Sequence, residues 1–294
     1  MERSRFPNKV LPYLLLIPAA VSSIIFIIIP AAQSLYQSFF FSHPFTGQMR
    51  YVGLKHYQSL FSDPEYLNSV RITFVFSAFV VIVGMGLSLL LSVLLSKRIR
   101  GVSYFQLGLL WPYALSPAMA ATLWALLTHP SIGPISHFLE FLIGKRMNWI
   151  TDAFSAQFML IIASIWKNMG YNIVFFLAGL ANIPRDFSEA ARIDGAGPLR
   201  EFFTITFPLL SPVTFFLVVT NILYALFDIF PMVDLLTRGG PGRSTDLLIY
   251  KLYRDGFLNF NIGIASAQSV ILFVVVSILT LLIFKFGSSR IHYQ

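Results

Sequence analysis

Ionisable and amide side chains occur inside two long apolar segments of this sequence. Lys167 lies in "IWKNMGYN" and Asp228 lies in "YALFDIFP". A charged side chain at the centre of a membrane-spanning helix costs about 2.5 to 3.5 kcal/mol on insertion scales, so such residues are functional candidates by default. The helical period places neighbouring polar groups on shared strips, and Asn221 and Asp228, seven residues apart, are expected on one face. The candidate residues of a substrate pathway are Lys167, Asn168, Tyr171, Asn172, Asn221 and Asp228.

Two interpretations of these residues stay open. In the first, they line a water-accessible path, and the ammonium group of Lys167 attracts an anionic group such as phosphate. In the second, Lys167 and Asp228 pair with each other or with another subunit and hold helices together. A single lysine is a modest phosphate ligand compared with a bidentate arginine, so an arginine of a partner would carry more of that task.

A second concentration of charge lies in "SEAARIDGAGPLREFF", residues 188–203. Pro184 before it, the spacing of Glu189 and Arg192, and Gly195 after it predict a helix of about ten residues. A helix this short is marginal in water, so it needs a partner surface.

The side chains of this short helix suit docking into a groove. Ala190 and Ala191 give it a shallow side, while Glu189 and Asp194 present carboxylates to basic residues. The alternative is a solvated loop that only reconnects two spans, which is the usual role of a charged loop.

Composition indicates that these residues belong to a membrane protein. Apolar residues make up 56% of the chain, charged residues only 12%, and the mean hydropathy is +0.73. Soluble domains have about twice that charged fraction. We expect an all-α polytopic membrane protein, with residues 1–294 forming one transmembrane domain. The six apolar segments of about 20 residues that a helical span needs lie near 10–32, 72–96, 105–127, 157–181, 209–233 and 262–284.

The distribution of basic residues predicts the orientation in the membrane. The net charge of +8 falls between apolar segments rather than on one polar face, which argues against a nucleic-acid partner. Lys and Arg residues precede the first span and follow the second and the sixth, so both termini and the turn at 184–208 are expected in the cytoplasm. The loop 234–261 should then lie outside, although it holds four basic residues among acidic ones.

Other functional classes lack the residues that they require. The chain has no Cys, which excludes disulfides and thiolate metal sites. The stretch nearest to a phosphate-binding loop, "TRGGPGRST" at 237–245, has Thr237 in place of the first Gly and Arg243 in place of the Lys. All five His lie outside the apolar segments, which disfavours a membrane-embedded enzyme. We expect no catalytic residue, metal or cofactor in this chain.

The charged turn also carries a recognisable spacing. Glu189-Ala190-Ala191, Gly195, Ile205 and Phe207-Pro208 resemble the "EAA…G………I-LP" signature of permease subunits of ATP-binding-cassette (ABC) importers, with Phe207 in place of Leu. Other stretches, among them "LPYLLLIPA", "LLWPYALSPAMAATLW" and "FDIFPMVDLLTRGGPG", are similar to the sugar-type, MetI-like permeases that depend on a binding protein. Within that family the similarity is greatest to permeases of sn-glycerol-3-phosphate importers.

This resemblance implies a fold, a location and partners. The fold is that of a type I ABC importer permease with six transmembrane helices in the bacterial cytoplasmic (inner) membrane. The implied partners are a second permease subunit in a heterodimer, two copies of a cytoplasmic ATPase that bind ATP and Mg, and an extracytoplasmic substrate-binding protein.

The resemblance also implies roles for the charged turn and the solute. The turn at 184–208 is the coupling helix that docks in the ATPase, and its residues are Glu189, Ala190, Ala191, Arg192, Asp194 and Gly195. The implied solute is sn-glycerol-3-phosphate with related glycerophosphodiesters, and the alternative is a neutral sugar or oligosaccharide.

Overall fold

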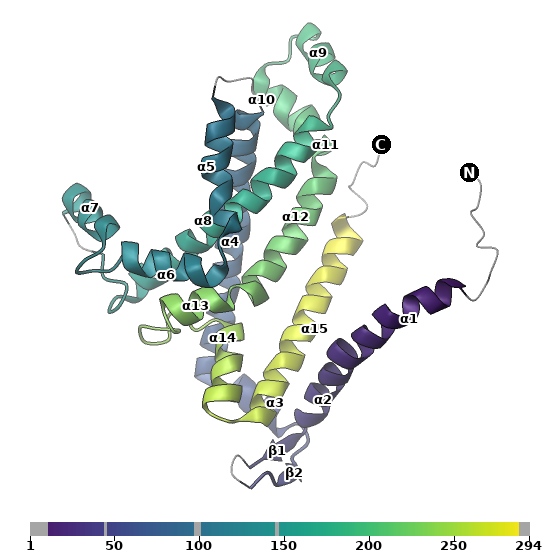
Figure 1. Ribbon diagram of the computed structural model, residues 1–294, viewed down its shortest axis with the longest axis vertical. Coiled ribbons are helices and arrows are strands. Elements are labelled where there is room, and N and C mark those ends of the chain that lie inside the picture. The colour runs from purple at the N-terminus through teal and green to yellow at the C-terminus, as the bar shows by residue number, and fades with distance from the viewer. Residues whose placement is uncertain (1–10, 44–45, 97–100, 145–146, 288–294) are drawn as a thin grey trace. The chain divides into compact units, whose positions relative to one another are not determined.

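The computed structural model describes residues 11–43, 46–96, 101–144 and 147–287. This part of the chain is largely helical, with one antiparallel hairpin of β1 (Phe40–Ser42) and β2 (Met49–Tyr51), in which Phe41 is opposite Arg50 (Figure 1). Contacts divide the chain into two compact units. The first holds the described residues up to Asp63 together with Leu252–Val274, and the second holds Pro64–Lys251 and the described residues from Val275 onward.

The first unit is built on the N-terminal apolar segment, which is helical from Leu11 to Gln37. Its elements are α1 (Leu11–Ser23), the π-helical turn η1 (Ile24–Ile28), α2 (Ile29–Gln37), the hairpin, α3 (Lys55–Ser62), the π-helical turn η4 (Arg254–Leu258) and the first half of α15 (Ile262–Gly287). Polar contacts join these elements: the hydroxyl of Tyr57 donates to Ser38 over 2.8 Å, and the amide of Gln268 donates to Asp255 over 2.7 Å.

The second unit contains the longest helices of the chain. Its elements are α4 (Pro64–Leu95), α5 (Val102–Ala114), α6 (Pro117–Leu127), α7 (Pro134–Ile143), α8 (Ala153–Ala181), α9 (Arg185–Ile193), α10 (Pro198–Glu201), η2 (Phe202–Thr206), α11 (Phe207–Leu209), α12 (Ser211–Leu223), η3 (Tyr224–Asp228), α13 (Phe230–Leu236), α14 (Leu248–Tyr253) as far as Lys251, and the second half of α15.

Three long helices form the core of this unit. α4 packs along α8, and α12 packs against both. Met85, Phe176 and Leu217, one from each helix, meet in a buried cluster. Helix α5 also lies close to α8, and a Cβ atom at Gly170 would come within 3.0 Å of the Leu109 carbonyl oxygen, so the absence of a side chain at Gly170 permits this close approach.

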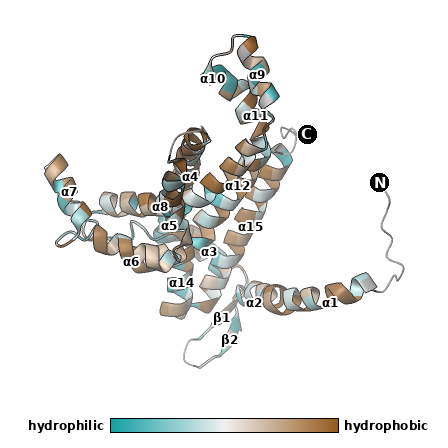
Figure 2. Ribbon diagram, turned by 45° about the horizontal axis from the view of Figure 1, so that its top comes forward, coloured by the Kyte–Doolittle hydropathy of each residue, from teal (hydrophilic) through white to brown (hydrophobic). Residues whose placement is uncertain are grey.

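Five helical segments of the described chain are long and apolar enough to cross a membrane. They are Pro12–Gln37, Pro64–Leu95, Ala153–Ala181, Ser211–Asp228 and Ile262–Lys285. Figure 2 shows hydrophobic residues along α12 and α15 and hydrophilic residues at α10. The segment near 105–127, expected as one span, consists of the two helices α5 and α6, which are bent by 106° relative to each other, so it is a broken span or a re-entrant loop.

The bend between α5 and α6 has a local cause and a tertiary support. Pro117 lacks an N–H group and forces the preceding Ser116 into an extended conformation with ψ of 150°, which ends the helical hydrogen-bond pattern. The hydroxyl of Ser116 then accepts the N–H of Met119 over 3.2 Å and caps α6. Trp166 of α8 contacts Trp111 of α5 and Trp124 of α6 edge-on, each with ring centroids 5.8 Å apart.

Candidate functional site

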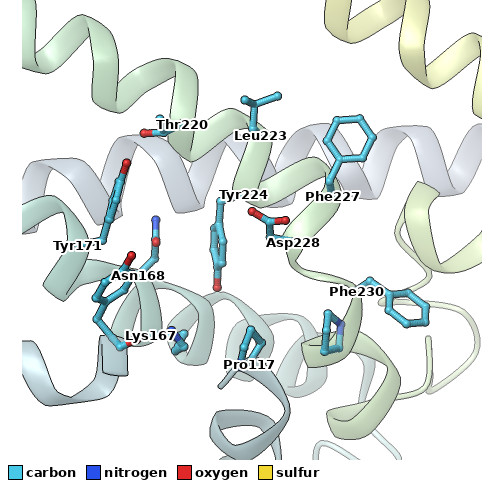
Figure 3. Close-up of a pocket in the computed structure, with 12 residues that line it drawn as sticks. Pro117, Lys167, Asn168, Tyr171, Thr220, Leu223, Tyr224, Phe227, Asp228 and Phe230 are labelled. Atoms are coloured by element: carbon cyan, nitrogen blue, oxygen red, sulfur yellow. Dashed lines mark hydrogen bonds between the residues drawn. The ribbon is translucent and has the colours of Figure 1, made fainter. Parts of the chain in front are cut away.

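A cavity of about 690 Å³ lies in the second unit where its helices are broken. The break between α5 and α6 forms one wall, α8 forms another, and α12 with η3 and the start of α13 forms a third (Figure 3). Irregular backbone at membrane depth is tolerated where it lines a cavity, because water or a solute can satisfy its polar groups. The lining residues are Tyr113, Pro117, Lys167, Asn168, Tyr171, Thr220, Leu223, Tyr224, Phe227, Asp228, Phe230 and Pro231.

Lys167 is buried, at 6% exposure, and its partner is the end of α5. Its Nζ donates to the carbonyl oxygen of Tyr113 over 3.0 Å and lies 5.0 Å from the centroid of the Tyr113 ring. The last carbonyls of a helix carry partial negative charge, so the ammonium group stabilises the broken end of α5. The aromatic face adds a cation–π attraction. A lysine ammonium has three donors, so it can also bind a ligand in the cavity.

Three amides form a buried cluster between α8 and α12. Asn221 Nδ2 donates to Asn172 Oδ1 over 2.7 Å. Asn221 Oδ1 accepts from Asn168 Nδ2 over 2.8 Å and from Asn172 Nδ2 over 3.1 Å. Asn172 and Asn221 are each 1% exposed and do not line the cavity, whereas Asn168 does. The cluster therefore joins two helices, and only Asn168 also faces the cavity.

Asp228 lies on η3 and is exposed in the cavity. In the described part of the chain, Asp228 forms no ion pair with Lys167. The structure therefore does not contain the pairing of these two residues that the second interpretation expected within this chain. The expectation that Asn221 and Asp228 share a face also differs from the structure. A π-helical turn between them has more residues per turn than an α-helix, so Asn221 reaches the amide cluster while Asp228 reaches the cavity.

Sequence reasoning missed several aromatic residues of the cavity. Tyr113, Tyr224 and Phe227 line it, and Tyr224 is buried with its hydroxyl 3.4 Å from the Ser164 carbonyl oxygen. The available signal was the pair of prolines, Pro117 and Pro231, because each marks a break in an apolar segment.

The charged turn forms the expected short helix, α9, and this helix ends at the expected glycine. Gly195 has φ of 76°, and the N–H of Ala196 reaches back to the Ala191 carbonyl over 2.9 Å, a helix-ending turn that favours glycine. Glu189 and Asp194 are exposed. Ala191 is buried at 7% exposure, so only Ala190 of the alanine pair is accessible. The side chain of Arg192 is outside the described part of the chain.

The charged helix α9 and the loop at 237–245 are two different regions of the second unit. Figure 1 shows α9 and α10 at one end of this unit, beyond α11. The loop resembling a phosphate-binding motif is a closed turn, in which the Thr245 hydroxyl contacts the Thr237 hydroxyl over 2.7 Å and the Gly240 carbonyl over 2.8 Å. It lies between the helices α13 and α14, whereas a phosphate-binding loop follows a strand.

Comparison with known proteins identifies the family. Residues 102–293 match the family described as "Binding-protein-dependent transport system inner membrane component". The chain belongs to this family. It is 43% identical over 294 residues to the "sn-glycerol-3-phosphate transport system permease protein UgpA" of Brucella abortus biovar 1 (strain 9-941), with 100% of both chains covered. It is 44% identical to the protein of the same name from Escherichia coli O157:H7, covering 100% of this chain and 99% of that one.

Solved structures confirm the predicted fold. A chain of a bacterial ABC transporter involved in the import of the acidic polysaccharide alginate is 22% identical, with a TM-score of 0.82 and 95% of both chains covered. A chain of the MetNI methionine ABC transporter is 15% identical, with a TM-score of 0.52, covering 81% of this chain and 99% of that chain. By its family and its full-length relatives, the chain is a membrane permease subunit of an ABC importer, a transport protein and not an enzyme.

Proposed function

We propose that this chain forms part of a transmembrane path for sn-glycerol-3-phosphate and related glycerophosphodiesters. The observation that carries the proposal is the identity of 43% along the whole chain to permeases named for this solute. The cavity supports it independently, because it holds one buried cation, Lys167, at the broken end of α5.

The cavity provides complementary groups for both ends of such a solute. The ammonium group of Lys167 would bind the phosphate, and burial strengthens this interaction because water competes less well. Asn168 uses its Nδ2 for the amide cluster, which leaves its Oδ1 to accept a hydrogen bond from a glycerol hydroxyl. The Asp228 carboxylate can accept another. A partner subunit would complete the path and supply further cations.

Coupling to ATP hydrolysis would occur through α9. Its exposed Glu189 and Asp194 suit a basic cleft of an ATPase, with Ala190, Ala191, Arg192 and Gly195 shaping the turn. We propose that this turn and both termini face the cytoplasm. The complete importer would contain this chain as one transmembrane domain, a second permease, two ATPase copies that bind ATP and Mg, and an extracytoplasmic binding protein.

A neutral sugar or oligosaccharide is the alternative solute. The rings of Tyr113, Tyr171 and Phe227 in the cavity favour it, because aromatic faces pack well against the apolar face of a sugar ring.

Uptake by the complete transporter decides between these solutes. The importer would be reconstituted in vesicles with its binding protein and ATP, and uptake of labelled sn-glycerol-3-phosphate, a glycerophosphodiester and maltose would be compared. We expect ATP-dependent uptake of the first two and none of maltose. Uptake of maltose alone would overturn the proposed solute and leave the permease assignment intact.

Substitution of Lys167 tests its role within the same assay. Lys167→Met removes the cation, and because a hydrogen bond to a charged group contributes about 1.5 to 3 kcal/mol, we expect the KM for sn-glycerol-3-phosphate to rise about tenfold or more. Lys55→Met, which removes an exposed lysine on α3, is the matched control. An unchanged KM with normal ATPase assembly would show that Lys167 only supports the end of α5.

A further inference from the structure

A second cavity, of about 350 Å³, lies between α4, α8 and the turn that precedes α14. It is separate from the first, because Gln157 in its wall precedes Lys167 on α8 by ten residues, or about 15 Å along a helix. Its volume lies within the range of about 300 to 1,000 Å³ that is usual for ligand sites.

The walls of this cavity are held in place by contacts within the second unit. The amide of Gln157 donates to the Ser244 carbonyl oxygen over 2.7 Å, which fixes the turn to α8. The N–H of Leu248 donates to the Thr73 hydroxyl over 2.8 Å, which fixes it to α4. Arg243 of the turn also forms an ion pair with Glu65 at the start of α4. The cavity is thus formed before any ligand binds.

The polar side of the cavity presents donors without partners. Ser244 is 8% exposed and its buried hydroxyl has no hydrogen-bond partner in the part of the chain that the structure describes. A buried polar group without a partner is unfavourable, so a ligand that supplies an acceptor is favoured there. Arg71 lines the same cavity, and no described carboxylate lies within ion-pair distance of it. An arginine with five N–H donors beside a free hydroxyl suits an oxyanion, and a phosphate above all.

The other side of the cavity is apolar. Ile72 and Val75 of α4 and Ile161 of α8 line it. Arg71 immediately precedes the apolar stretch of α4, a position in which a long basic side chain keeps its apolar stem in the bilayer and its charge at the interface. A free phosphate ion would leave the apolar wall uncovered, whereas a phospholipid would contact both walls.

We propose that this cavity binds the phosphate of an anionic phospholipid, on Arg71 and Ser244, with the adjoining glycerol and acyl carbons against Ile72, Val75 and Ile161. The lipid would hold the turn at 237–247 against α4 and α8. The proposal does not depend on which solute crosses the membrane.

Lipid retention by the complete transporter tests this site. The transporter would be purified from nanodiscs of phosphatidylcholine and phosphatidylglycerol, and retained phosphatidylglycerol would be counted by native mass spectrometry. We expect Arg71→Gln and Ser244→Ala each to weaken retention of one phosphatidylglycerol, by about fivefold for the arginine, since a basic residue near the surface contributes about 1 kcal/mol. Arg50→Gln, on β2, is a matched control for loss of an exposed arginine. Equal retention in all four proteins, each with an unchanged melting temperature, would overturn the proposal.

A second arm distinguishes lipid phosphate from free phosphate. A photoactivatable phosphatidylglycerol should label α4 or α8 in the transporter with native Arg71 and not in the Arg71→Gln transporter, and inorganic phosphate should not prevent the labelling. If inorganic phosphate bound in an Arg71-dependent manner and no lipid label appeared, the lipid assignment would be overturned in favour of a soluble phosphate.

Discussion

The polar residues of the α9–α10 turn are exposed, whereas those between α8 and α12 are buried. Glu189 on α9 and Asp194 directly after it are exposed. Between α8 and α12, Asn172 and Asn221 are almost fully buried and bond to each other. The difference shows which polar residues of an apolar chain serve the fold and which await a partner. Buried polar groups require internal hydrogen bonds, whereas exposed charges do not.

Lys167 is buried and bonded like the amide cluster, and it also faces a cavity that a ligand could enter. Its ammonium group has a partner in the Tyr113 carbonyl, yet it lines a cavity large enough for a small solute. The amide cluster behind it keeps α8 and α12 together, and of its three members only Asn168 also faces the cavity. Substitutions in the two regions should therefore have different effects on stability and on transport.

The largest expected effect comes from reversing a charge on the exposed turn. Glu189→Lys would place a positive charge against a cleft that we expect to be basic, and like charges in an interface cost several kcal/mol. ATP-driven uptake should fall by at least about 100-fold while the chain still inserts in the membrane. Uptake in vesicles and copurification of the ATPase measure this.

The control for this charge reversal is Arg50→Glu, at a position on β2 that is also exposed. It should leave uptake unchanged. Normal uptake by the Glu189→Lys protein would remove the coupling role of α9.

Removing the central amide should affect stability instead. Asn221→Leu leaves Asn168 and Asn172 without their shared acceptor, so we expect the free energy of unfolding to fall by about 1.5 kcal/mol. Equilibrium unfolding in bicelles measures it, and Asn182→Leu, at an exposed position after α8, is the control. An equal change for both variants would contradict the structural role of the cluster.

The smallest expected effect concerns the end of α9. A methyl group at Gly195 would meet no atom within 4 Å, but the φ of 76° is unfavourable for alanine. Gly195→Ala should destabilise α9 by about 1 kcal/mol and speed hydrogen exchange of its amides. Gly197→Ala is a matched control, because Gly197 has φ of −70° and equal space. Similar exchange in both variants would show that backbone conformation does not limit α9.

The fold class and the short helix could be predicted because they depend on local sequence. Runs of apolar residues gave the membrane segments, and Gly195 marked the end of α9. Four of the six expected pathway residues line the cavity: Lys167, Asn168, Tyr171 and Asp228. Asn172 and Asn221 do not, because they bond to each other across two helices, and the helical period of one segment does not show such a pairing. The π-helical turn η3 also interrupts the α-helical repeat between Asn221 and Asp228.

The sequence by itself determined that the chain is apolar and helical and that a compact charged helix interrupts its apolar segments, since these properties follow from composition and from interactions within one or two turns. Only the tertiary structure decided the partners of the buried polar groups. Lys167 bonds to a carbonyl 54 residues away, and Asn221 bonds to amides 49 and 53 residues away. Such pairs form where packed helices bring distant segments within about 3 Å, and no local pattern specifies that geometry.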